Sequence, residues 1–178
     1  MISCVSEEAK LEKQISEAYV AALNEFGPDL TDHFPSSLIS PRQFSVIYPA
    51  GAIDNGMAFF IYTQQVDSSE FRSTIAKLNS NNIQALNPKD SAFIIIGDSL
   101  EYRHKTSFQS YERDFGLNNK YLTENHTLYI LESREGIYMD HDYLPTNRSL
   151  PKKWKHGFTR GLATNKKQNE LIYWLCVW

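Results

Sequence analysis

The sequence is poor in the features that mark secreted and membrane-spanning proteins. It has only two cysteines, Cys4 and Cys176, near opposite ends of the chain, whereas small secreted domains are often dense in disulfides. No apolar run approaches the roughly 18 residues that a membrane span needs, and the first residues lack the basic and apolar segments of a signal peptide. We therefore expect free thiols and a soluble, cytoplasmic protein with no membrane partner.

Spacing motifs that identify enzymes are missing as well. The sequence contains no P-loop, dinucleotide-binding glycine pattern, nucleophile elbow, HExxH or CxxC. Gly97-Asp98-Ser99 follows an apolar run, as a nucleophilic serine does in some hydrolases, but the rest of that signature is absent and an ordinary turn is the better interpretation. No ligand cluster has the spacing of a structural zinc site. We expect no cofactor and no metal.

What the chain does have is the composition of a globular protein. Its 178 residues are 42% hydrophobic and 22% charged, which favours a single domain spanning residues 1–178 with a real core. Aromatic residues make up 13% of the chain. Because aromatic side chains are enriched at protein interfaces as well as in cores, their number also hints at a binding surface.

The clearest predicted element is a helix over residues 7–26. Ser6 can cap its N-terminus, and Gly27-Pro28 end it. One apolar stripe recurs at helical spacing and is expected to pack on the rest of the protein. Its members are Leu11, Ile15, Ala18, Tyr19, Ala22, Leu23 and Phe26.

The remaining pattern alternates strands with short helices. Residues 43–48 and 57–66 predict a hairpin, 68–79 a helix, 92–98 a buried strand and 107–116 a short helix. Residues 126–133 and 137–144 predict a second hairpin, 145–169 a loop and 170–178 a final strand. The fold class is therefore predicted as α+β. We expect a mixed, largely antiparallel sheet of about five to six strands, with the N-terminal helix and two shorter helices packed on it.

The second predicted hairpin carries an acid–histidine–acid sequence. Successive strand residues point to opposite faces, so Asp140 and Asp142 share one face while His141 points to the other. A tight turn would pair Leu128 with His141 and Tyr129 with Asp140, which places His141 on the core side. Two carboxylates could hold Mg²⁺ or Ca²⁺, but no further oxygen ligands are visible in the spacing.

The face opposite His141 is a candidate partner-binding surface. It combines acidic groups, which can steer a basic partner, with aromatic rings that a partner can bury; its members are Tyr129, Tyr138, Asp140 and Asp142. A simple solvated strand face is the alternative interpretation.

A second candidate lies in residues 148–167, which hold seven lysines and arginines and no acid. Lys152, Lys153 and Trp154 are its candidate partner-binding residues. Cations and rings together also suit nucleic acid, and a solvated loop has the same composition. The sequence pI of about 5.9 counts against a dedicated nucleic-acid binder.

Charge is divided unevenly along the chain. Residues 1–101 hold six basic and thirteen acidic residues, a net of −7, and residues 102–178 hold twelve and eight, a net of +4. In size, compartment and composition the chain resembles the bacterial immunity proteins of polymorphic-toxin systems, including the contact-dependent inhibition type. That resemblance implies a non-catalytic protein that binds one toxin domain tightly and neutralises it by stoichiometric binding.

Two other functions remain open. One is an enzyme, a metal-independent ribonuclease or a phosphoesterase, in which scattered histidines act beside the basic stretch. It requires a histidine and a cation to converge in one pocket; the five histidines are His33, His104, His126, His141 and His156. The other is a regulatory domain that contacts nucleic acid through residues 148–167. Taken together, the residues lean against an enzyme.

Overall fold

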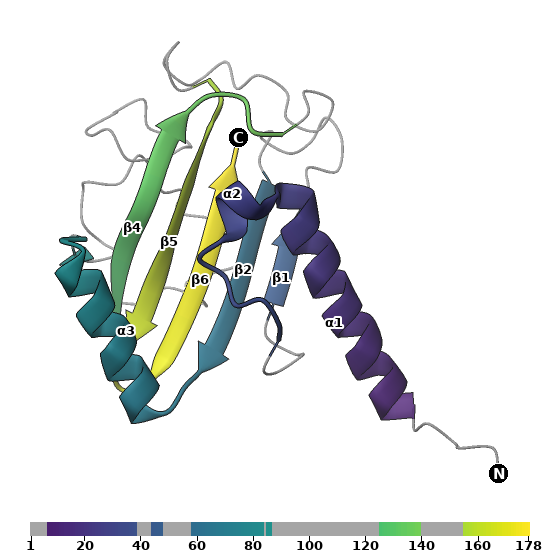
Figure 1. The fold of residues 1–178 in the computed structure, drawn as a ribbon, viewed down its shortest axis with the longest axis horizontal. Helices are drawn as coiled ribbons and strands as arrows, with labels where there is room; N and C mark the ends of the chain where they lie inside the picture. Colours follow the sequence, from purple (N-terminus) through teal and green to yellow (C-terminus); the bar gives the residue numbers. More distant parts are fainter. Residues whose placement is uncertain (1–6, 39–43, 48–57, 84, 87–124, 140–154) are drawn as a thin grey trace.

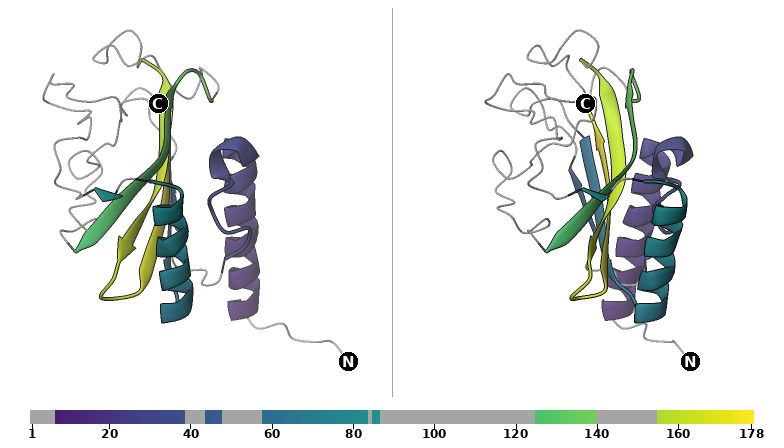
Figure 2. Two further views of the ribbon diagram at one scale, coloured as in Figure 1. Left: turned by 60° about the vertical axis from the view of Figure 1, so that its left-hand side comes forward. Right: turned by 90° about the vertical axis from the view of Figure 1, so that its left-hand side faces the viewer.

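The computed structural model describes residues 7–38, 44–47, 58–83, 85–86, 125–139 and 155–178. They form a six-stranded sheet in the order β1-β2-β6-β5-β4-β3, with every neighbouring pair antiparallel. The described helices lie against one face of this sheet (Figures 1 and 2). The predicted α+β class is confirmed. The elements are α1 (Glu7–Phe26), α2 (Pro28–Thr31), β1 (Phe44–Ile47), β2 (Ala58–Gln65), α3 (Ser68–Ser80), β3 (Ala85–Leu86), β4 (His126–Glu135), β5 (Gly157–Asn165) and β6 (Glu170–Val177).

Several predicted elements are present at the expected positions. The N-terminal helix has the predicted bounds, the first hairpin forms from β1 and β2, and α3 and β6 match the predicted helix and final strand. The short helix α2 was not predicted. The predicted strand 92–98 and helix 107–116 lie outside the described residues. None of the described helices is long and apolar enough to cross a membrane.

Helix α1 packs on the sheet with only part of its predicted apolar stripe. Tyr19 and Phe26 are buried, but Ile15 is partly exposed and Leu11 is 54% exposed. The expectation that the whole stripe is covered is wrong, because α1 crosses the edge strand β1 and its N-terminal turns run out past the sheet (Figure 1).

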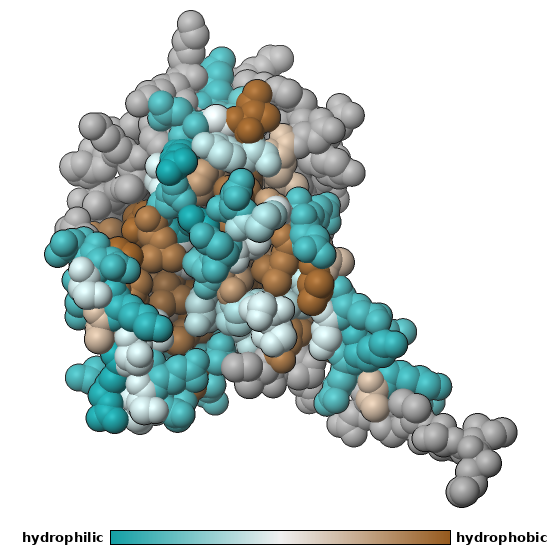
Figure 3. All heavy atoms as spheres, viewed as in Figure 1, coloured by the Kyte–Doolittle hydropathy of each residue, from teal (hydrophilic) through white to brown (hydrophobic). Residues whose placement is uncertain are grey.

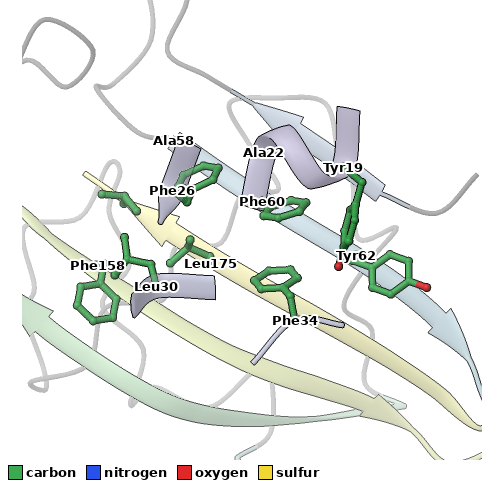
Figure 4. Packing of buried hydrophobic residues seen from close by; sticks show 11 residues of the cluster. Tyr19, Ala22, Phe26, Leu30, Phe34, Ala58, Phe60, Tyr62, Phe158 and Leu175 are labelled. Carbon is green, nitrogen blue, oxygen red and sulfur yellow. The ribbon is translucent and has the colours of Figure 1, made fainter. Parts of the chain in front are cut away.

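The buried part of α1 belongs to an aromatic core (Figure 4). Phe60 of β2 lies at its centre, stacked on Phe34 at a centroid distance of 4.5 Å and on Phe26 at 5.8 Å. Tyr19 contacts the edge of Phe60 and donates a hydrogen bond of 2.8 Å to the carbonyl oxygen of Pro35. The chain after α2 is thus fixed to both the helix and the sheet.

The second predicted hairpin is not the one that forms. Leu128 of β4 pairs with Ala163 of β5 on one side and with Leu86 of β3 on the other. Both edges of β4 are therefore already paired at this position, and His141 cannot pair there. The described residues that follow β4, Gly136–Met139, are not in a strand.

The partner of β4 comes from the segment predicted as a loop, 145–169. Residues 157–165 form β5, which lies between β4 and β6. Glycine is unfavourable inside a strand, and the two glycines of β5, Gly157 and Gly161, are the reason that the sequence did not predict a strand here. A Cβ atom on Gly161 would lie 2.4 Å from the Trp174 ring and 2.3 Å from the Tyr129 carbonyl oxygen, and one on Gly157 would lie 2.8 Å from the Trp178 ring. Each glycine therefore makes room for an indole of the adjoining segment.

The tryptophans belong to the sheet face that α1 and α3 do not cover. Trp174 and Trp178 are each 1% exposed, and their neighbours on this face, such as Ile61, are buried as well. Both faces of the sheet are therefore buried at its centre. This explains why β6 reads as an almost continuous apolar run rather than an alternating one.

Alanine substitutions along α1 should lower the free energy of unfolding by different amounts, according to how far the sheet covers each position. Phe26→Ala removes a ring from the core and should cost roughly 3–5 kcal/mol, whereas Leu11→Ala, on the uncovered turns, should cost less than about 0.5 kcal/mol. Ile15→Ala should fall between them, below the roughly 2–5 kcal/mol of a fully buried site. Urea denaturation of the three variants measures this gradient; equal losses would contradict it.

Candidate functional site

A cluster of charged side chains lies on the helix-side face of the sheet. Arg160 of β5 faces Glu132 of β4 in the strand register, and its Nε and Nη2 atoms lie 3.0 Å and 2.7 Å from Glu132 Oε2. Its Nη1 atom donates a hydrogen bond to Asp32, the residue after α2. With a side chain only 13% exposed, Arg160 connects the α2 segment to the sheet by charge-assisted hydrogen bonds.

The cluster opens to solvent at two ends. Arg134 reaches Glu132 Oε1 at 2.6 Å and is 68% exposed, and Asp32 is 63% exposed. We name these four residues, Asp32, Glu132, Arg134 and Arg160, the charged cluster. The two cations and two carboxylates of the cluster balance each other in charge. The two more exposed members, Arg134 and Asp32, present one charge of each sign at the surface.

His33 lies beneath the charged cluster. Its Nε2 atom is 3.1 Å from the carbonyl oxygen of Trp174, and since a carbonyl can only accept, Nε2 carries the proton. Burial, with the nearby Arg160 charge, lowers the His33 pKa to about 4, against the opposing effect of the Trp174 hydrogen bond. The ring is therefore neutral at pH 7 and acts as a structural link between the α2 segment and β6.

Beside the charged cluster, the chain leaves β4 in a fixed bend. Gly136 has a φ of +138°, a conformation that favours glycine, and its amide donates a 3.0 Å hydrogen bond to the His156 carbonyl. The Tyr138 ring contacts Phe158 edge-on at a centroid distance of 4.5 Å. Ile137 lies between these two fixed points and is 60% exposed.

The structure separates the two tyrosines predicted to share a binding face. Tyr129 is only 5% exposed and packs with Phe71, Leu78 and Leu162 beneath α3, so the expectation that it is exposed is wrong; burial raises its pKa. Tyr138 is partly buried at the bend. Asp140, Asp142, Lys152, Lys153 and Trp154 lie outside the described residues, so their assignment remains a prediction.

The histidines within the described ranges do not converge. His126 is buried on the sheet face opposite His33, with its Nε2 atom 3.2 Å from Glu170 Oε2. His156 is partly buried after the gap at 140–154, and its carbonyl fixes the Gly136 bend. His104 and His141 lie outside the described residues. Among the residues that are described, no group of three or more His, Cys, Asp or Glu is placed to hold a metal ion.

Sequence reasoning missed the charged cluster. Its members come from three distant segments, and Arg160 was assigned to a loop. One signal was available: small residues alternate with larger ones along Gly157, Thr159, Gly161 and Ala163. Small residues at every second position are compatible with a strand whose one face lies against bulky tryptophans. If residues 157–165 had been predicted as a strand, Arg160 would have been placed on the face opposite the glycines.

Comparison of the chain with protein-family models, with curated proteins and with solved structures finds no match. The interpretation of the site therefore depends on its geometry.

The depressed His33 pKa predicts a specific loss of stability in acid. The unfolded chain takes up this proton below about pH 6.5 and the folded chain only near pH 4, so the contribution is complete above pH 6.5 and is lost as the pH falls toward 4. At pH 5 the loss is about 2 kcal/mol. Urea denaturation of the wild type and of His33→Gln at pH 7 and pH 5 should show this extra loss in the wild type alone. The same pH dependence in both proteins would mean that His33 does not titrate in this way.

Proposed function

We propose that this chain is a non-catalytic protein-binding module, and more specifically an immunity or antitoxin protein that neutralises a cognate toxin domain by stoichiometric binding. The observation that carries the proposal is the fixed bend after β4. An isoleucine that is 60% exposed stands there between a backbone hydrogen bond and a ring contact. An exposed apolar side chain on a backbone held by contacts on both sides can be buried by a partner with little further loss of backbone entropy.

The surroundings of Ile137 support a protein partner. Arg134 and Glu135 are exposed just before it, and the acidic residues Asp140 and Asp142 follow closely in the sequence. An apolar anchor within a charged rim is the usual anatomy of a specific interface. The rim charges would act mainly on the rate of association.

The division of charge along the chain supports the same proposal. Residues 1–101 and 102–178 carry net charges of −7 and +4, and an uneven distribution of charge over a surface orients an approaching charged partner. A toxin domain with the complementary distribution would be captured quickly and then held through Ile137, which becomes buried in the complex.

The proposal is tested with a toxin domain encoded beside this chain as the candidate partner. Ile137→Ala should weaken the complex at least about fivefold, because an anchor truncation costs at least about 1 kcal/mol. Asp140→Lys with Asp142→Lys should slow association, and the wild-type on-rate should fall with added salt as the Debye length shrinks to about 3 Å at 1 M. Lys77→Glu on the exposed side of α3 is the matched control. Surface plasmon resonance gives both rates.

Other outcomes assign the surface differently or reject the proposal. If only Lys152→Glu with Lys153→Glu weakens the complex, the basic stretch is the contact and the bend is not. If no variant changes the affinity, the surface is elsewhere. The binding proposal is wrong if the purified chain alone degrades RNA or a phosphoester and loses that activity on His104→Ala or His156→Ala.

A further inference from the structure

The apolar stripe of α1 continues beyond the part that the sheet covers. Tyr19, Ala22 and Phe26 are buried, whereas Leu11, on the same stripe, is 54% exposed and Ile15 is partly exposed. The uncovered turns, Glu7–Ala18, span about 18 Å at 1.5 Å per residue. They stand out from the body of the molecule, with mostly hydrophilic side chains toward the viewer in Figure 3.

Charges are sorted around these uncovered turns. With about 100° per residue, Glu7 and Glu12 flank the Leu11–Ile15 stripe on its two sides. Lys13 falls opposite the stripe, where it pairs with Glu17 at 3.6 Å. Lys10 lies about 120° from the centre of the stripe, further from it than either glutamate. Glu7 and Glu12 are exposed. The open apolar stripe therefore has an acidic border, and the lysines point away from it.

We propose that the uncovered stripe of α1, residues 7–18, docks on an apolar protein surface rimmed by lysine or arginine. The inference goes beyond the proposed function, because this surface is distinct from the Ile137 bend and takes a partner of its own stated chemistry. Leu11 and Ile15 supply the buried contact, and Glu7 and Glu12 meet the basic rim. This is the arrangement of amphipathic-helix recognition.

A second copy of this chain fits the same surface poorly. Antiparallel pairing through Leu11 and Ile15 would bring the Glu12 side chains of the two copies within about one helical turn of each other, where like charges repel.

A membrane surface fits poorly too. Helices that lie in a bilayer interface carry lysine and arginine on their polar face, and these attract anionic lipid. On α1 the side chains next to the apolar stripe are Glu7 and Glu12, which anionic headgroups repel.

The test uses the full chain, labelled with ¹⁵N, and a designed helical peptide of three heptads with leucine at the a and d positions and lysine at the flanking ones. We expect chemical-shift changes confined to residues 7–18. Glu7→Lys with Glu12→Lys should weaken peptide binding roughly tenfold, as expected for two reversed charge pairs. The matched control Lys10→Glu with Lys13→Glu should retain binding, and a peptide with glutamate in place of lysine should not bind.

Several results would overturn the inference. These are no binding of the lysine peptide, shifts outside residues 7–18, or equal binding of the glutamate peptide. A chain that dimerises by analytical ultracentrifugation and becomes monomeric on Leu11→Lys would assign the stripe to a second copy. Shifts of the same residues with anionic vesicles would assign it to a membrane. Because the probe is not the toxin domain, peptide binding without toxin binding would reject the proposed function alone.

Discussion

The close approach of β5 to the tryptophan of β6 is the constraint on which the rest of the described structure depends. Gly161 has no room for a Cβ atom, since the Trp174 ring and the Tyr129 carbonyl occupy that space. This contact fixes the β5–β6 hairpin at the centre of the sheet, where it pairs with β2 on one side and β4 on the other. The N-terminal helix and hairpin are therefore assembled on the last strands of the chain, which makes the central contacts of the fold long-range ones.

The surface features follow from this central hairpin. Because Gly161 faces Trp174, its neighbour Arg160 points to the other face and meets Glu132 and Asp32. That contact fixes the end of α2, and Phe158 on the same face supports the Tyr138 ring. The charged cluster and the Ile137 bend thus both contact residues of β5, Arg160 and Phe158. A side chain on a backbone held by such contacts loses less conformational entropy when a partner buries it, which is what the proposed binding function asks of Ile137.

Local patterns predicted the elements whose own sequence carries a clear signal, whatever the sequence separation of their contacts. The apolar stripe and the caps predicted the bounds of α1, and the β-branched and aromatic runs predicted β1, β2 and β6. The partner of β4 could not be predicted in this way, because turn chemistry at Arg134–Gly136 favoured a hairpin with the next segment over a strand twenty residues further on. Because of that error, Tyr129 was predicted to lie on a binding surface, whereas it lies in the core. Leu11 shows the opposite error: helical periodicity indicates which face of α1 is apolar, but not how far the sheet extends beneath it.

The stability of Gly161→Ala tests the central claim most directly. A methyl group at this position must displace a backbone carbonyl or the Trp174 ring, and overpacking of this kind should lower the free energy of unfolding by roughly 3 kcal/mol. Urea denaturation followed by tryptophan fluorescence measures this loss. A variant within about 0.5 kcal/mol of the wild type would show that β5 and β6 do not pack closely at this point, and the account of the sheet built on that contact would be wrong.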